Sequence, residues 1–151
     1  EVLGVSPHLF EVRLRIAQIE LGRQNREVAI REAEAAAEEG ARSPFAQGFA
    51  GQILVQAGQP EKGLVRFQAA AKLDPHVSGP RIGQAVALTM MGRMGEAEVQ
   101  AKAATELEPQ NPAAWQVLGG IYSEQGKEAD AAACEAKVQE ILSRRTPPSN
   151  R

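Results

Sequence analysis

Small and apolar residues recur along this chain in a pattern that repeats every 34 residues. The pattern is clearest at Gly58, Gly92 and Gly126, which stand 34 positions apart and share similar small and apolar neighbours. A unit of this length is one helix-turn-helix pair, which buries its apolar face by stacking on the next pair. The pattern therefore predicts an all-α protein whose function resides on a surface rather than in a catalytic pocket.

The repeating pattern divides the chain into eight expected helices. Pro75 and Pro109 mark two ends between repeats, because proline cannot continue a helix and biases the residue before it away from the helical conformation. Alanine-rich runs such as Ala69–Ala71 are strong helix formers. The expected helices are 8–21, 25–39, 44–57, 60–73, 78–91, 94–107, 112–125 and 128–143.

The unit from Pro112 to Ile141 carries the most specific motif. Its characteristic residues are Trp115, Leu118, Gly119, Tyr122, Gly126 and Ala131. This order resembles the tetratricopeptide repeat, whose first helix reads W-x-x-L-G-x-x-Y and whose second helix carries a small residue where the two helices touch. The resemblance implies a right-handed superhelix of about four stacked helix-turn-helix repeats, in which Trp115 fills the core against a neighbouring repeat.

The expected organisation is an N-terminal lead at 1–7, a single repeat domain at 8–143 and a disordered tail at 144–151. Three repeats follow the period, at 44–77, 78–111 and 112–143. The first, at 8–43, is irregular: its turn glycine is Gly22, where the period predicts position 24, which suggests a two-residue insertion around Arg23–Asn25.

Composition and charge exclude several kinds of chemistry. A net charge of −2 supplies no basic field for a phosphate backbone, so we expect no nucleic-acid binding. Cys134 is the single cysteine and is expected to be a small core residue. His8 and His76 are two repeats apart, roughly 20 Å or more, which excludes a shared metal site. We expect no catalytic residue, no metal, no cofactor and no enzymatic activity.

The ends of the chain bear on its location and context. No apolar stretch reaches the roughly 18 residues that a membrane span needs, so we expect a soluble protein, with the cytoplasm favoured and the periplasm open if a signal peptide was removed. The first residue is Glu1 rather than Met, which leaves open a lost signal sequence or a missing domain. On the last helix, Val138, Ile141 and Leu142 lack a polar capping helix, which predicts dimerisation or a continuing chain.

The resemblance also implies where a ligand binds, since the first helix of each repeat lines the concave face of the superhelix. Few of the residues carried onto that face are charged, and the Lys, Arg and Asn clamp that some family members use for acidic C-termini is missing. We therefore expect the partner to be an apolar or amphipathic protein segment. The predicted groove residues are Phe45, Phe49, Gln52, Val55, Gln56, Ile82, Val86, Thr89, Met90, Gln116, Val117 and Glu124.

The resulting hypothesis is a protein–protein interaction or scaffold module that binds a partner segment in a largely uncharged groove. Two alternatives remain open. The chain could be a substrate-holding appendage of a larger enzyme, of the transferase or hydroxylase class, or a self-assembling scaffold. In the self-assembling case, a homo-oligomer forms through the terminal helix or the groove, and the groove receives the terminal helix of a neighbouring copy. A groove that is filled by the chain's own first helix or by a second copy, and so takes no other partner, is a separate alternative.

Overall fold

The computed structural model describes residues 9–145, and in this part of the chain all regular structure is α-helical. The observed bounds differ from the expected ones by no more than two residues, because the turn glycines and the prolines define both ends of most helices. The helices are α1 (Leu9–Gly22), α2 (Arg26–Glu39), α3 (Pro44–Gln56), α4 (Pro60–Leu73), α5 (Gly79–Met90), α6 (Met94–Leu107), α7 (Pro112–Glu124) and α8 (Glu128–Arg145).

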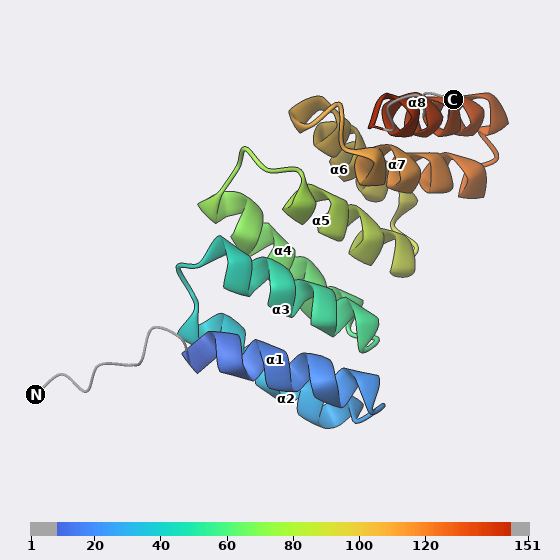
Figure 1. Cartoon of the computed structure of the whole chain (residues 1–151). Helices are drawn as coiled ribbons and strands as arrows, with labels where there is room; N and C mark the ends of the chain where they lie inside the picture. The colour runs from blue at the N-terminus through green and yellow to red at the C-terminus, as the bar shows by residue number, and fades with distance from the viewer. Residues whose placement is uncertain (1–8, 146–151) are drawn as a thin grey trace, which may run out of the picture. The chain divides into compact units, whose positions relative to one another are not determined.

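The chain divides into two compact units, the first ending at Pro75 and the second beginning at His76. Each unit contains two antiparallel helix pairs, α1–α2 and α3–α4 in the first and α5–α6 and α7–α8 in the second (Figure 1). Within a unit, the first helix of the later pair packs against both helices of the earlier pair. The single domain expected at 8–143 stays a prediction, and each unit is described by itself.

Helices α3 and α7 each begin with a proline that follows a capping side chain. Pro44 and Pro112 occupy the first helical position, where a missing N–H costs nothing. Before them, the hydroxyl of Ser43 accepts a hydrogen bond from Ala46 N at 3.1 Å, and the side-chain oxygen of Asn111 accepts one from Ala113 N at 3.1 Å. These caps satisfy donors that the helix itself leaves unpaired.

In the turn inside each repeat, the residue at the same repeat position has a left-handed backbone conformation. Gly58, Gly92 and Gly126 have φ of 82°, 73° and 73°, a conformation that glycine adopts without strain. In the first repeat the residue in this conformation is Gln24, with φ of 64°. The residue that follows it, Asn25, donates its N–H to Glu20 O at 2.8 Å, as the residues after the three glycines do to their own helices.

The predicted insertion around Arg23–Asn25 is therefore wrong. Position 24 is in register with the other turns, and Gln24 adopts the left-handed conformation there. The turn is closed by the same backbone hydrogen bonds with or without glycine, so the period of 34 holds through the first repeat.

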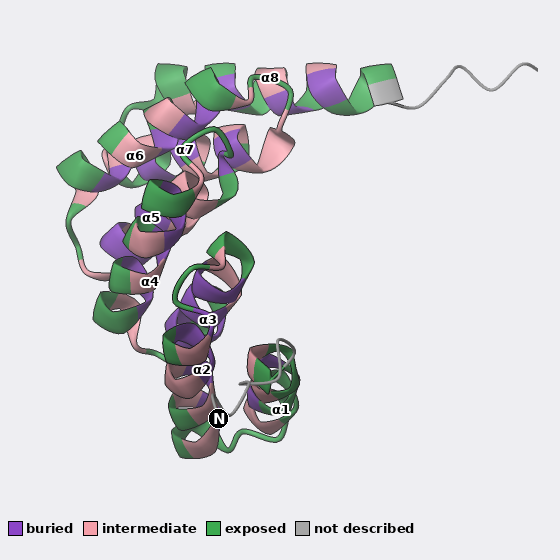
Figure 2. Ribbon diagram, turned by 90° about the vertical axis from the view of Figure 1, so that its left-hand side faces the viewer, coloured by how far each residue is buried: buried purple, intermediate pink, exposed green. Residues whose placement is uncertain are grey.

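Small residues form the contact surfaces between helices. In the first unit a core cluster joins alanines of α2 to residues of α1 and α3. Figure 2 shows these buried faces where the helices of a unit meet. With so few rings, packing relies on close backbone approach: a Cβ added to Gly51 of α3 would lie 3.2 Å from the ring of Phe67 on α4. The cluster comprises Leu14, Ala17, Ala29, Ala33, Ala36, Ala37, Ala50, Ile53 and Leu54.

The last helix differs from the sequence expectation in two ways. Helix α8 runs to Arg145, so residues 144 and 145 are helical rather than part of a tail. Val138 and Ile141 are buried, because they pack within the second unit, and only Leu142 of the three is exposed. The expected lead at 1–7 and the rest of the expected tail, 146–151, lie outside the described residues.

Candidate functional site

The first unit has a hollow of about 350 Å³ between helices α1 and α3. Both are first helices of their repeats, the helices that the sequence assigned to a concave face. Phe45 and Phe49 line the hollow from α3, and the α1 side is formed by residues one repeat earlier. Its full lining is Glu11, Leu14, Arg15, Gln18, Phe45 and Phe49.

Phe45 and Phe49 form the apolar wall of this hollow. They lie four residues apart, so they share one face of α3, and their rings stack with centroids 5.6 Å apart and planes 12° apart. Phe45 is 60 % exposed, whereas Phe49 also packs against the core cluster. An exposed ring stacked on a half-buried one is a rigid apolar contact surface.

The opposite wall adds charges that the sequence analysis missed. Glu11 and Arg15 project from α1, and Arg15 forms no ion pair with any residue that the structure describes. The sequence prediction assigned groove residues only to the three regular repeats and none to the first repeat. The 34-residue period could have found these residues, since Glu11 and Arg15 are the equivalents of Phe45 and Phe49.

The other predicted groove residues of the first unit behave differently from one another. Gln52 and Gln56 are exposed on α3. Val55 is buried, because its side chain fills the space that Gly63 of α4 leaves open. Val55 is therefore a packing residue and is unavailable to a ligand, which corrects the prediction at this position.

In the second unit, the predicted residues lie along α5 and α7. Ile82, Val86 and Val117 are half-buried, and Met90 is exposed. Thr89 is also half-buried, and its hydroxyl donates a hydrogen bond to Ala85 O at 2.9 Å within α5. The lone pairs of this hydroxyl can still accept a hydrogen bond from a ligand. Gln116 and Glu124 are exposed on α7.

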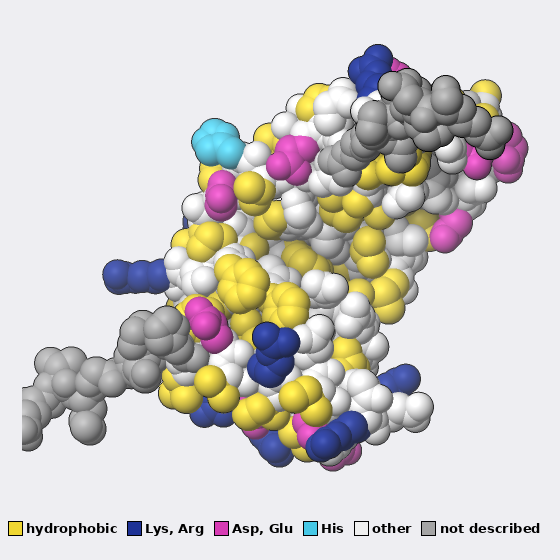
Figure 3. All heavy atoms as spheres, viewed as in Figure 1, with side chains coloured by type: hydrophobic (Ala, Val, Ile, Leu, Met, Phe, Trp, Pro, Cys, Tyr) yellow, Lys and Arg dark blue, Asp and Glu magenta, His cyan; other side chains and the backbone are white. Residues whose placement is uncertain are grey.

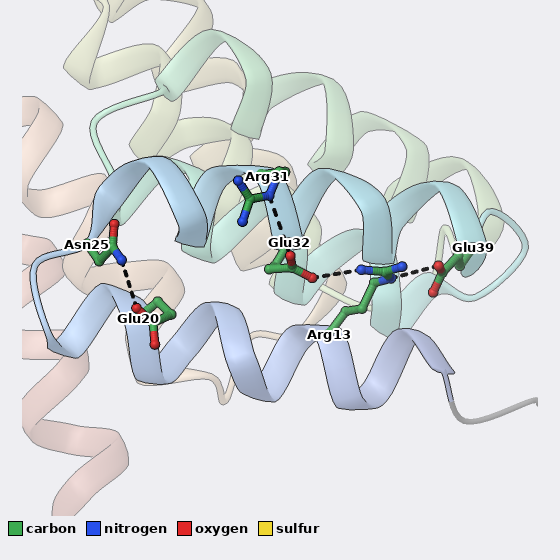
Figure 4. A network of polar contacts seen from close by, with 6 residues as sticks. All are labelled: Arg13, Glu20, Asn25, Arg31, Glu32 and Glu39. Carbon is green, nitrogen blue, oxygen red and sulfur yellow. Dashed lines mark hydrogen bonds and ion pairs between the residues drawn. The ribbon is translucent and has the colours of Figure 1, made fainter.

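Ion pairs tie the helices together behind these surfaces. Arg13 of α1 lies between Glu32 and Glu39 of α2, with nitrogen–oxygen distances of 2.8 and 2.7 Å (Figure 4). These hydrogen bonds, that of Glu39 first, raise the pKa of Arg13. The network fixes α1 on α2 and so holds one wall of the hollow in place.

The second unit has a comparable network, centred on Glu98. Its carboxylate accepts hydrogen bonds from Lys102 at 2.6 Å and from Lys127 at 2.9 Å, and both amino groups lie near the ring of Tyr122. Hydrogen bonding, from Lys102 most of all, lowers the pKa of Glu98 to about 2. A charge held in this way is part of the fold rather than a free group for a ligand.

A second hollow, of about 450 Å³, lies between α7 and α8. Trp115 lines it and is half-buried, so the prediction that Trp115 belongs to the core is wrong. The indole N–H donates to Pro109 O at 2.9 Å, which holds the ring against the segment before α7. The other lining residues are Gln116, Gly119, Gly120, Ser123, Glu128, Ala131, Ala132, Glu135, Val138 and Gln139.

The remaining candidates for chemistry lie apart from both hollows or inside the fold. Cys134 is 4 % exposed, which confirms its expected place in the core, and burial raises the pKa of its thiol. His76 is exposed, whereas His8 lies outside the described residues. Among residues 9–145 no group of His, Cys, Asp and Glu side chains could hold a metal ion.

A family model described as tetratricopeptide repeat matches residues 54–119. This stretch of the chain is therefore similar to tetratricopeptide repeat proteins. Among solved structures, it is similar to a crystal structure of MamA, with a TM-score of 0.75 and 17 % identity, over 95 % of this chain and 84 % of that one. It is also similar to TTC0263, a tetratricopeptide repeat protein of Thermus thermophilus, with a TM-score of 0.76 and 19 % identity, over 90 % and 75 % of the two chains.

A third similar structure is YrrB, described as a tetratricopeptide repeat protein with an unusual peptide-binding site. It aligns with a TM-score of 0.71 and 22 % identity, over 92 % of this chain and 72 % of that one. At these identities the likeness concerns the fold. No curated protein matches the sequence, and none of the described helices combines the length and hydrophobicity that crossing a membrane requires.

Proposed function

We propose that this chain is a protein-interaction module of tetratricopeptide repeat type that binds a segment of a partner protein along the first helices of its repeats. The observation that carries the proposal is the hollow between α1 and α3, with its exposed, stacked Phe45–Phe49 pair. Aromatic side chains in a well-supported pocket are typical anchors of protein interfaces. The peptide-binding site named for the similar protein YrrB agrees with this use of the fold.

The chemistry of the hollow defines the kind of segment that fits. The phenylalanine pair favours an aliphatic or aromatic side chain, and Arg15 supplies a cation beside it that a carboxylate can pair with. The partner is therefore an amphipathic segment with an apolar residue next to an acidic one. Figure 3 shows hydrophobic side chains reaching the surface over α1 and α3 among single charged residues, as this mixed chemistry requires.

The second unit offers a further stretch of the same kind. Ile82, Val86 and Met90 repeat at a spacing of four along α5, and Val117 lies on α7. They form a second apolar surface on the first helices of the later repeats. Polar groups that orient a bound backbone come from Thr89, Gln116 and Glu124 in the second unit. In the first unit they come from Gln52 and Gln56 of α3.

A peptide library displayed on phage and selected on the full chain tests the proposal. Recovered peptides should pair an apolar residue with a neighbouring Asp or Glu, and Phe45→Ala should weaken their binding by at least about tenfold, because the exposed ring is lost. Arg15→Glu should shift the selection from acidic to basic neighbours. Val65→Ala is the matched control, since Val65 is similarly exposed but lies on α4.

Val86→Arg extends the test to the second unit. Peptides that bind the apolar surface of α5 should lose affinity when this charge is introduced, and circular dichroism should show an unchanged helix content. Recovered peptides that bind Phe45→Ala as tightly as the original chain would exclude the hollow as the binding site. A selection with no enrichment over an unrelated helical protein would exclude the function itself.

A further inference from the structure

Helix α1 carries an apolar stripe on a face that lies outside the hollow between α1 and α3. That hollow, lined by Phe45 and Phe49, is called the phenylalanine hollow below. Leu9, Val12, Ile16 and Ile19 are 39, 54, 39 and 48 % exposed, and their spacing places them along one side of the helix. Since successive helix residues turn by about 100°, Ile16 and Gln18 of the hollow point roughly 160° apart. We name Leu9, Val12, Ile16 and Ile19 the α1 stripe.

The same repeat positions are buried in the first helix of the later repeat of each unit. Val12, Ile16 and Ile19 correspond to Ala46, Ala50 and Ile53 of α3 and to Ala114, Leu118 and Ile121 of α7. All six of these equivalents are no more than 4 % exposed. In α3, Ala50 and Ile53 belong to one core cluster with the alanines of α2. The α1 stripe is therefore one half of a contact that each unit makes internally, between the second helix of one repeat and the first helix of the next.

The hollow between α7 and α8 has the position of the other half of that contact. Ala131, Glu135, Val138 and Gln139 of α8 are the equivalents of Ala29, Ala33, Ala36 and Ala37, which α2 buries in its core cluster. On α8 all four of these positions line the hollow, together with the half-buried ring of Trp115. The volume of about 450 Å³ remains open to side chains from outside the second unit.

Charges on the two surfaces are complementary. Glu128 and Glu135 line the hollow, and within residues 9–145 neither forms an ion pair. Arg15 borders the α1 stripe on the side of the phenylalanine hollow. Opposite charges at the border of an apolar contact favour its formation and fix its register.

We propose that the α1 stripe of one copy of this chain seats in the α7–α8 hollow of a second copy, so that copies associate head to tail. The contact is heterologous, because it joins two different surfaces. Each added copy still presents one free stripe and one free hollow, and association therefore continues beyond a dimer. The contact shares only Arg15 with the phenylalanine hollow, and the proposal does not depend on the proposed function.

Two variants block one half of the contact each. Ile16→Glu places a charge in the centre of the stripe, where the exposed position tolerates it. Gly120→Phe fills the hollow, and a Cβ at Gly120 meets no atom within 4 Å, so the fold accommodates it. Val99→Glu is the matched control, because Val99 is 61 % exposed on α6, outside both surfaces.

Sedimentation equilibrium on the full chain gives the readout. The mass of the wild type and of Val99→Glu should rise with concentration, and added salt should reduce the rise, since charges contribute. Each blocked variant alone should stay at the mass of one chain, 16.1 kDa. An equimolar mixture of the two should reach the mass of two chains and stop there, because only one intact stripe and one intact hollow remain to pair.

The other outcomes overturn the proposal. A wild type that keeps the mass of one chain at every concentration leaves the α1 stripe to a different occupant. Association that Ile16→Glu abolishes and Gly120→Phe leaves intact indicates a stripe-to-stripe contact. A mixture of the blocked variants that does not associate shows that the two surfaces are not partners.

Discussion

In both units the start of the first helix meets the residue that ends the second helix, yet the two junctions use different chemistry. In the first unit Phe10 packs on Gly40, and a Cβ at Gly40 would lie 3.2 Å from the ring and even closer to Ala46. In the second unit the equivalent residues are Ser78 and Glu108, and the hydroxyl of Ser78 donates a hydrogen bond to the Glu108 carboxylate. An apolar contact on glycine and a polar pair thus close the same repeat position.

In the first helix of the later repeat of each unit, different side chains likewise make the same kind of contact. Gln47 of α3 donates its side-chain amide to Ala37 O at 2.6 Å, and Trp115 of α7 donates its indole N–H to Pro109 O at 2.9 Å. Both side chains stand at the same repeat position and tie their helix to the backbone near the preceding junction. The two units therefore share a geometry and a hydrogen bond, while the residue that provides them changes.

The largest effect is expected at the apolar junction. Gly40→Val forces a branched side chain against Phe10 and Ala46, and over-packing of this kind should cost about 3 kcal/mol of the free energy of unfolding. Urea unfolding followed by circular dichroism measures the loss. Gly22→Ala is the control, because no atom lies within 4 Å of a Cβ there. Equal stability of the two variants would show that the junction is not tightly packed.

The polar junction should respond less to mutation but more to pH. Ser78→Ala removes the main partner of the Glu108 carboxylate and should cost about 1–2 kcal/mol. The hydrogen bond from Ser78, followed by that from Asn111, lowers the pKa of Glu108. A carboxyl with a lowered folded pKa stabilises the fold above its unfolded pKa, and this contribution is lost as the pH falls through the folded value.

Acid should therefore weaken the second unit through Glu108, and through Glu98 as the pH falls from about 4.5 towards about 2. The single tryptophan, Trp115, lies in the second unit and reports its unfolding by fluorescence. Glu108→Gln should flatten this pH dependence, with the first-unit variant Glu34→Gln as control. A pH profile unaltered by Glu108→Gln would contradict the assignment.

The smallest effect is expected at the turns. Gln24→Gly should stabilise the chain by about 0.5 kcal/mol, because glycine relieves a left-handed strain of about 1 kcal/mol and the larger entropy of the unfolded chain offsets part of this gain. Gly58→Ala should have the opposite sign and cost about 1 kcal/mol. Thermal unfolding of both variants compares them, and equal signs would contradict the shared turn geometry.

The sequence predicted the helices well because glycine and proline act locally. A turn glycine and a helix-ending proline leave little freedom in where a helix begins or stops, and these residues recur with the period. The same reasoning failed at Gln24, since hydrogen bonds to the preceding helix can hold a residue without glycine's freedom in the same conformation. The turn was predicted at Gly22 because glycine favours the left-handed conformation, whereas the backbone hydrogen bonds place the turn at Gln24.

The candidate site was harder to predict because exposure depends on neighbours far away in the sequence. Val55 is buried only because Gly63 leaves room for it, and Val138 and Ile141 are buried by the packing of their own unit. Trp115 remains at the edge because its partner is a carbonyl of the connecting segment. The repeat position of a residue predicts the helix face on which it lies. Whether its side chain is buried depends on the size of the residue that packs opposite it.

The single cysteine gives the second unit a built-in reporter of its opening. A thiolate is the reactive form of cysteine, and both the burial of Cys134 and its raised pKa keep that form scarce and shielded in the folded chain. Alkylating reagents can therefore reach it only during transient exposure of α8. With one thiol in the chain, the labelling rate measures how often α8 opens, without any engineered probe.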